Sequence, residues 1–344
     1  MKVWDRSCAA TFAVAMIGVV LPTAVVAQQL NVVCSVQAEW CTAAANEFQR
    51  ESGIKVALVL KGSGESMAQI AAEKANPKLD VWFGGTGDPH LQAAEQDLTL
   101  PYKSPMLDQL RPWAKKQAEQ SGYRTVGLYL GVLGIGYNTE LLAKKNLPVP
   151  ACWRDLGKPQ YAGDVQMANP NASGTAYTAI ATLVQLFGEE EAFKLLKDMH
   201  KNISSYARQG VGPIKATARG ENIVAVAFIH DVITEAQAGF PVKSVAPCEG
   251  TGYEIGSISI VKGSRNVDAA KKFVDWALTP AAQKLGQDSK QFQLPSNIGT
   301  PVSPLSPKPS EIKLIDYNFA KYGASAERKR LLERWDRDVA GAAR

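Results

Sequence analysis

The N-terminal part of the chain alternates between the strand and the helix periods of apolar residues. Apolar residues dominate 30–34, recur at helical spacing through 40–48, and occupy every second position through 54–60. A second helix is predicted at 67–74 and a short third strand at 80–83. This order of strand, helix, strand, helix and strand predicts an α/β fold with a parallel sheet. Ligands of such sheets bind at the carboxyl ends of the strands.

Two later apolar stretches predict crossings between two lobes. A chain of 344 residues exceeds one ordinary domain core, so two lobes are expected. The glycine-punctuated run at 125–137 can carry the chain into the second lobe, and a strand predicted at 255–261 can carry it back. We therefore expect 28–131 together with 256–344 in lobe 1, and 132–255 in lobe 2, with a ligand in the cleft between them.

The first residues have the features of a secretory signal. Lys2 and Arg6 precede an apolar segment at about 9–26, which ends in the small-residue pattern Val-Val-Ala at 25–27. We expect residues 1–27 to be removed, so that the mature protein begins near Gln28 in the periplasm. An uncleaved membrane anchor is the alternative, and the proline that interrupts the apolar segment disfavours it.

Charge and cysteine content narrow the class further. The net charge of +5 is spread along the chain without a basic block, which argues against nucleic acid as a partner. Four cysteines remain after the signal, and in an oxidising compartment they predict two disulfides. Three pairings are possible. We favour Cys34 with Cys41, because one ends a strand and the other lies in the first turn of the next helix, which leaves Cys152 with Cys248. A zinc site is the alternative, but Cys-x-x-Cys spacing and a nearby histidine are missing.

Three loops at predicted strand ends are suited to anions. Residues 169–178 (NPNASGTAYT) indicate a strand end, a tight turn and a helix that opens on hydroxyl and glycine residues. Such a helix start presents unpaired N–H groups and the positive end of the helix dipole. Similar glycine-rich loops follow the second and third strands at 61–66 and 84–90, where Asp88 is expected to cap a helix that begins at Pro89. Ordinary capping and turn formation are the alternative interpretation.

Several segments, in order, resemble a known family. Across nearly all of the mature chain the sequence is similar to the periplasmic solute-binding proteins of ABC importers, in the class of ferric-iron binders and their hexose-phosphate-binding relatives. The matching segments are 48–56 (FQRESGIKV), 76–85 (NPKLDVWFGG), 132–142 (VLGIGYNTELL), 169–177, 217–221 (TARGE) and 278–283 (LTPAAQ).

The resemblance implies a type II periplasmic binding protein. Each lobe would hold a mixed, mostly parallel sheet flanked by helices, and a two-strand hinge would join the lobes. The protein would act as a monomer without a cofactor, close over a small solute and deliver it to an inner-membrane permease. Delivery of the signal to a sensor kinase is the alternative use of the same binding event.

Iron is disfavoured as the solute by one departure from the family pattern. Iron binders of this class supply two adjacent tyrosines from a strand end in the second lobe, because ferric ion prefers anionic oxygen ligands. This chain has no two adjacent tyrosines, and the comparable strand end runs into Ile-His-Asp-Val at 229–232. We expect no metal in the site. Ferric iron and phosphonates or other oxyanions remain the alternatives within the class.

The residues at that strand end suit a sugar. A histidine next to an aspartate can bind the vicinal hydroxyls of a polyol, and the resemblance places His230, Asp231 and Glu254 at the sugar-contacting positions of hexose-phosphate binders. Their alternative roles are a buried structural histidine, a helix N-cap and a solvated residue beside the hinge.

The phosphate would then lie at the loops described above. Its expected ligands are hydroxyl and backbone N–H groups from both lobes, at Ser63, Thr86, Ser173, Gly174 and Thr175. Charge-assisted hydrogen bonds of about 1.5 to 3 kcal/mol each make a phosphate the natural anchor. Weaker candidates are Lys61 and Arg208 for an added charge, and Ser35 and Glu39 for the far end of the sugar.

Enzymatic function is disfavoured. The chain has neither a Gly-x-Ser-x-Gly nor a His-Glu-x-x-His motif, and its three histidines are far apart in sequence. A secreted phosphatase that acts on the same substrates is the competing class, and we expect the protein not to be an enzyme.

Overall fold

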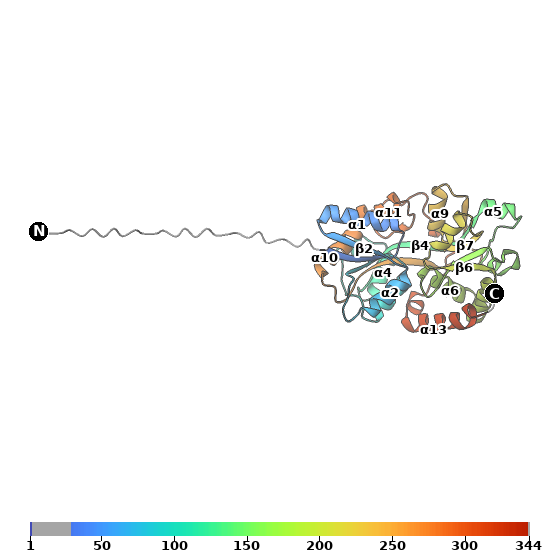
Figure 1. Ribbon diagram of the computed structural model, residues 1–344, viewed down its shortest axis with the longest axis horizontal. Helices are drawn as coiled ribbons and strands as arrows, with labels where there is room; N and C mark the ends of the chain where they lie inside the picture. The colour runs from blue at the N-terminus through green and yellow to red at the C-terminus, as the bar shows by residue number, and fades with distance from the viewer. Residues whose placement is uncertain (2–28, 343–344) are drawn as a thin grey trace.

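Two long antiparallel strands, β4 (Val126–Asn138) and β9 (Tyr253–Ile260), run side by side through the middle of the molecule (Figure 1). The structure is a computed structural model that describes Met1 and residues 29–342. The signal expected at 1–27 lies outside the described residues apart from Met1. The sheet extends to both sides of this central pair, with three further strands in order beyond β9 and three beyond β4.

Lobe 1 is built on the β9 side. Strands β1 (Gln29–Cys34), β2 (Lys55–Leu60) and β3 (Val81–Phe83) pair in parallel, and β3 pairs antiparallel with β9. Its helices are α1 (Ala38–Ser52), α2 (Ser63–Ala72), α3 (Gly87–Glu95), α4 (Pro112–Gln120), α10 (Val267–Ala277) and α11 (Pro280–Asp288). The short strand β10 (Leu294–Pro295) pairs with β4.

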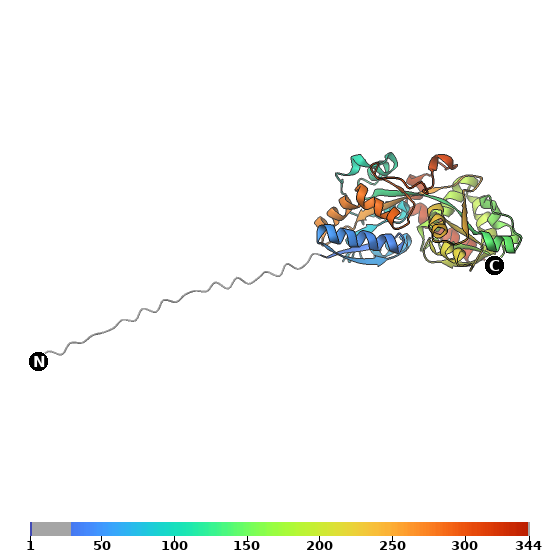
Figure 2. The ribbon, with the colours of Figure 1, turned by 90° about the horizontal axis from the view of Figure 1, so that it is seen from above.

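Lobe 2 is built on the other side of β4. Strands β5 (Val165–Ala168) and β6 (Ile203–Ala207) pair in parallel, and β7 (Val224–Phe228) and β8 (Val242–Val245) pair antiparallel with β4. Its helices are α5 (Thr139–Lys144), α6 (Gly174–Phe187), α7 (Glu189–Asn202), α8 (Gly212–Ala218) and α9 (Ile229–Gln237). The strands that cross between the lobes are the hinge pair, and Figure 2 shows one lobe at each of their ends.

The C-terminal segment returns to lobe 2. Helices α12 (Phe319–Tyr322) and α13 (Ser325–Trp335) and the π-helical turn Asp336–Ala340 share one hydrophobic cluster with lobe 2, through residues such as Tyr317, Leu331 and Trp335. The sequence had indicated lobe 1 for all of 256–344. The chain stays in lobe 1 only as far as the 290s. It then crosses the hinge region a third time.

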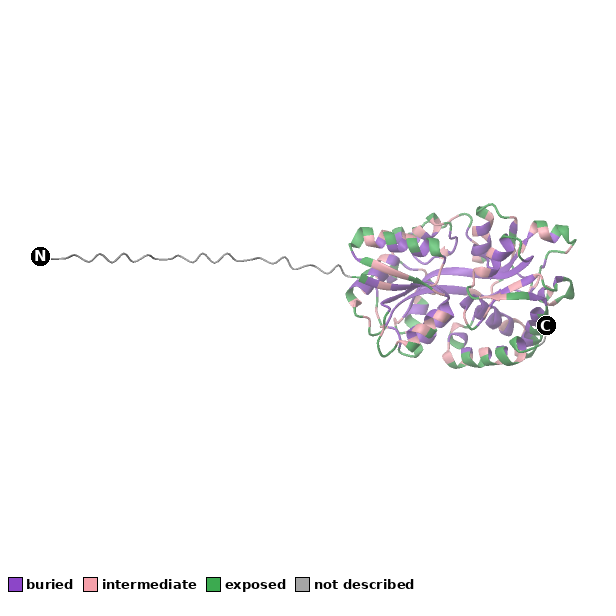
Figure 3. Cartoon of the chain, viewed as in Figure 1, coloured by how far each residue is buried: buried purple, intermediate pink, exposed green. Residues whose placement is uncertain are grey.

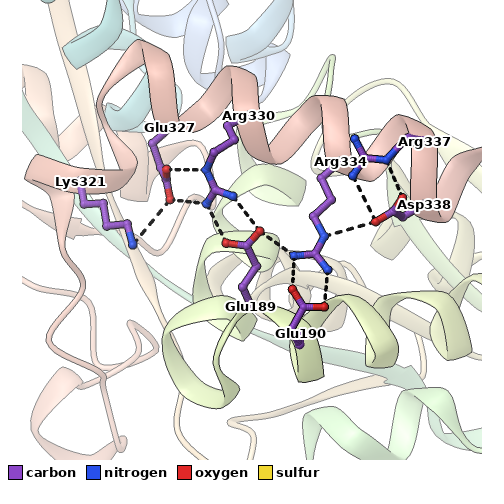
Figure 4. Close-up of polar contacts among 8 residues, drawn as sticks. All are labelled: Glu189, Glu190, Lys321, Glu327, Arg330, Arg334, Arg337 and Asp338. Carbon is purple, nitrogen blue, oxygen red and sulfur yellow. Dashed lines mark hydrogen bonds and ion pairs between the residues drawn. The ribbon is translucent and has the colours of Figure 1, made fainter.

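Ion pairs attach α13 to lobe 2 from outside. Arg330 and Arg334 both bind Glu189, and Arg334 also binds Glu190, with N···O distances of 2.7 Å (Figure 4). These two glutamates are in the first turn of α7, where acidic side chains also face the positive end of the helix dipole.

The α/β fold expected from the hydrophobic pattern is confirmed, and so is the disulfide pairing. The strands beside the hinge are buried on both faces (Figure 3). Cys34 is bonded to Cys41 and Cys152 to Cys248. Among the described helices, none is long and apolar enough to cross a membrane.

Candidate functional site

A cavity lined by residues of both lobes lies between them, where strands of both lobes end. The predicted residues Ser63, Thr86, Ser173, Gly174, Thr175, His230, Asp231 and Glu254 all line it, as do Ser35 and Lys61. The structure therefore brings the two sequence-predicted groups, one for an anion and one for a sugar, into a single space.

Three helices begin at one end of the cavity. Helix α2 begins at Ser63, while α3 and α6 have Thr86 and Ser173 as their N-caps. The expected cap at Asp88 was wrong, because the helix already begins at Gly87. The Thr86 N–H donates to Ser63 Oγ over 3.1 Å, and Thr86 Oγ1 is buried without a hydrogen-bond partner among the described residues. Converging helix starts of this kind are suited to an anion.

Few of the described side chains with a full positive charge lie near these helix starts. Of the described lysines and arginines, Lys61 lines the cavity, whereas Arg208 does not. The Arg208 side chain is 84% exposed, and its Nε lies 3.1 Å from Glu65 Oε1 of the other lobe. Arg208 thus closes a surface ion pair between the lobes. An anion in this cavity would be neutralised mainly by N–H and O–H dipoles.

A second part of the cavity lining carries three buried titratable groups. His230 and Asp231 are in the first turn of α9 and Glu254 is on β9, and each residue is at most 3% exposed. A Cβ built on Gly131 of β4 would lie 2.8 Å from Glu254 Oε1 and 2.9 Å from His230 Nδ1. The imidazole and the carboxyl therefore meet above a hinge position that has room only for glycine.

Burial sets the protonation of these groups. It lowers the pKa of His230 to about 3, so the imidazole is neutral at physiological pH. Burial, reinforced by Glu235, raises the pKa of Asp231 to about 7. Burial and the neighbouring Asp231 raise the pKa of Glu254 well above its ordinary value. His230 Nε2 lies 3.5 Å from Asp231 Oδ1, and with a neutral ring this contact is not an ion pair.

Several polar atoms in this part of the cavity have no described hydrogen-bond partner and are available to a ligand. His230 Nδ1, Gln37 Oε1 and Gln293 Oε1 are buried and have no partner within the described part of the chain. Gln37 also donates to Asp231 across the cleft. Native proteins rarely leave buried polar atoms unpaired, so a cavity lined by several is a binding site.

Two weaker candidates have other partners or positions. Ser35 Oγ accepts a hydrogen bond from Trp82 Nε1 over 2.9 Å and lies 2.9 Å from Ser66 Oγ. Glu39 faces a neighbouring cavity with Lys215 and Arg219. Neither side chain offers the cavity a free group.

Sequence reasoning missed Gln37, Tyr129 and Gln293, which all line the cavity. Gln37 follows the end of β1, so the strand-end rule could have found it. Tyr129 is on a hinge strand, where its hydroxyl accepts from the Gly85 N–H over 3.1 Å, and Gln293 follows α11. No local pattern distinguishes these two positions.

Metal-ligating geometry occurs elsewhere. Within residues 29–342, the cluster of three potential ligands consists of Cys152, Cys248 and Glu249. The two sulfurs are joined in a disulfide, so neither is available as a thiolate. His230, Asp231 and Glu254 do not form such a cluster.

Comparison with known proteins defines the class. Residues 76–322 match the family model of bacterial extracellular solute-binding proteins, and the chain belongs to this family. Its fold is that of the periplasmic binding protein AfuA from Actinobacillus pleuropneumoniae, solved with fructose-6-phosphate bound. The two are 44% identical with a TM-score of 0.89, over 92% of this chain and 99% of AfuA.

Two further relatives support this placement. The periplasmic binding protein P5PA is 37% identical with a TM-score of 0.88, over 91% of this chain and 99% of P5PA. An uncharacterized protein of Haemophilus influenzae is 45% identical over 90% of both chains. The protein is thus a solute-binding protein of the kind that serves ABC importers, and its family is not one of enzymes.

Proposed function

We propose that this protein captures a phosphorylated sugar, of the hexose phosphate class, in the periplasm and delivers it to an inner-membrane ABC permease. One observation carries the proposal. A single cavity joins three helix starts, at one of which the Thr86 hydroxyl has no described partner, to a buried His-Asp-Glu group in which His230 Nδ1 has none. The first end is complementary to a phosphate, and the second to a polyol. The fructose-6-phosphate in AfuA, at 44% identity, supports the same assignment.

The chemistry of each end fits its proposed partner. Ser63, Thr86 and the start of α6 would give the phosphate hydroxyl and N–H donors from both lobes. Asp231 and Glu254, with raised pKa values, can accept hydrogen bonds from sugar hydroxyls when ionised and donate one when protonated. The neutral His230 offers one donor and one acceptor.

Calorimetry with a small ligand panel tests the proposal. Glucose 6-phosphate or fructose 6-phosphate should bind one to one, inorganic phosphate should bind far more weakly, and glucose and ferric citrate should give no heat. Phosphate release from glucose 6-phosphate should not be detectable. Equal affinity for inorganic phosphate and hexose phosphates would favour an oxyanion binder, and a coloured stoichiometric iron complex would favour an iron binder. Either outcome would overturn the proposal.

A further inference from the structure

The lobes touch backbone to backbone beside the anion end of the cavity. Gly64 is in the first turn of α2 in lobe 1, and the loop before α6 in lobe 2 faces it. The Gly64 N–H donates to the Ala172 carbonyl over 3.1 Å. This hydrogen bond joins the lobes without any side chain.

The contact leaves no space for a side chain at Gly64. A Cβ there would lie 2.6 Å from the Asn171 carbonyl oxygen and 2.9 Å from that of Ala172. Both atoms are backbone, so no rotamer change relieves the overlap. The three nearest atoms all belong to lobe 2, and therefore the restriction exists only while the lobes are together.

The neighbouring glycines repeat the pattern. A Cβ on Gly62 would lie 2.8 Å from the Ala172 oxygen, and one on Gly174 of lobe 2 would lie 2.8 Å from Thr86 Cβ of lobe 1. Gly62 and Gly174 also line the cavity, whereas Gly64 does not. Gly64 thus limits how closely the lobes approach each other without lining the cavity that would hold the ligand.

Other contacts between the lobes can adjust to a small displacement. The ion pair of Glu65 with Arg208 uses long side chains at the surface, and Gln37 reaches Asp231 through its own flexible chain. The carbonyl groups of Asn171 and Ala172 are fixed by the turn, in which Ala172 and Ser173 N–H groups both donate to the Asn169 carbonyl. Of these contacts between the lobes, the one between Gly64 and the Asn171 and Ala172 carbonyl groups is therefore the rigid contact.

We propose that Gly64 is a positioning residue that sets ligand affinity by admitting the other lobe, without touching the ligand. This inference rests on the proposed function, because it assumes that binding is completed by closure. Closure also brings the positive start of α6 to those of α2 and α3, so an anion between them favours the closed state. A methyl group at Gly64 would hold the lobes apart and leave those donors too distant to share one phosphate.

The variant Gly64→Ala separates this role from a structural one. Alanine is the better helix former, so the unliganded variant should melt at the wild-type temperature or above it. Its affinity for glucose 6-phosphate should fall by about tenfold to a hundredfold, the range that one misplaced methyl group produces. Gly286→Ala is the matched control, since its methyl would crowd Trp40 inside lobe 1 alone. The control should retain wild-type affinity.

A second measurement does not depend on the identity of the ligand. Glu65→Cys with Arg208→Cys places one thiol on each lobe, on the two sides of the contact between them. The four native cysteines are protected in disulfides. A short bis-maleimide should cross-link this pair more slowly when Gly64→Ala is added, both without ligand and with inorganic phosphate.

The two measurements distinguish the two claims. A wild-type protein that does not bind hexose phosphates would overturn the proposed function. Equal cross-linking with and without the alanine, or wild-type affinity in Gly64→Ala, would overturn the role of Gly64.

Discussion

His230 Nδ1, Thr86 Oγ1 and Gln293 Oε1 are buried at one cavity, and none has a partner among the described residues. Leaving such an atom unpaired costs about 1 to 3 kcal/mol. A fold retains this cost where a ligand offsets it. At the scale of residues, the site is therefore defined by unsatisfied polar atoms and not by a cluster of charge.

Separate substitutions should divide the site into its two ends. Ser173→Ala with Thr175→Val removes hydroxyl donors worth about 1 kcal/mol each, and should weaken inorganic phosphate and hexose phosphates alike. Asp231→Ala should weaken hexose phosphates and leave inorganic phosphate nearly unchanged. Calorimetry with both ligands measures the difference. Equal losses of both ligands in both variants would refute the assignment of separate ends.

The pKa of Asp231 predicts a pH dependence of stability. A carboxyl with a folded pKa of about 7 binds more protons in the native state than in the unfolded state, so its contribution to stability falls as pH rises from about 4 to 7. The slope is at most about 1.4 kcal/mol per pH unit. His230, with its pKa lowered to about 3, acts in the opposite sense below about 6.5.

The comparison of wild type with Asp231→Asn isolates the carboxyl. We expect the melting temperature of the variant, measured from pH 5 to 8, to fall less with pH than that of the wild type. Parallel curves for the two proteins would show that Asp231 does not titrate in this range.

Local sequence pattern predicted candidate residues where chemistry follows a strand end, whereas Glu254, which lies inside β9, was predicted from the family resemblance. Ser63, Thr86 and Ser173 stand at such positions and reach the cavity. Gln293 and Tyr129 come from elements without a local signal, and their place depends on long-range packing. Arg208 is a predicted residue that does not reach the cavity, because it forms an ion pair with Glu65 of the other lobe.

At the scale of elements, α13 connects lobe 2 to the last turn of α3, where the Ser325 N–H donates to Glu95 Oε2 over 2.6 Å. Arg328 of α13 is 8% exposed, donates to the Pro170 carbonyl over 3.2 Å, and lies over the Tyr177 ring at 4.4 Å. Asp88 of α3 is buried nearby and accepts from Tyr317 Oη over 3.0 Å. The amphipathic pattern predicts this helix, but it contains no information about which lobe the helix covers.

Loss of the buried guanidinium should destabilise the protein. Arg328→Met leaves the buried Asp88 without the positive charge that favours its ionised form and the Pro170 carbonyl without its donor, at a cost of about 1 to 3 kcal/mol. Arg337→Ala, which removes an exposed ion pair with Asp338, should change stability by less than about 0.5 kcal/mol. Urea unfolding of both variants gives the comparison. Equal midpoints would show that Arg328 contributes nothing specific.

At the scale of the whole molecule, the proposed anion site is complete only when the lobes are together. Ser63 and Thr86 belong to lobe 1, whereas Ser173, Gly174 and Thr175 belong to lobe 2. The two-lobe architecture followed from the chain length and the family resemblance. The division of the chain between lobes could not be predicted as reliably, because the proline-rich stretch at 301–309 indicates a spacer but not the lobe to which the chain continues.

Solution scattering with and without glucose 6-phosphate tests the central claim most directly. A ligand that bridges both lobes shifts the population to the closed state, and at about a hundred times its dissociation constant it adds roughly 2.7 kcal/mol to stability. We predict a smaller radius of gyration in saturating glucose 6-phosphate, and no change in an equal concentration of glucose. An unchanged radius of gyration under conditions where calorimetry shows full occupancy would contradict capture by lobe closure.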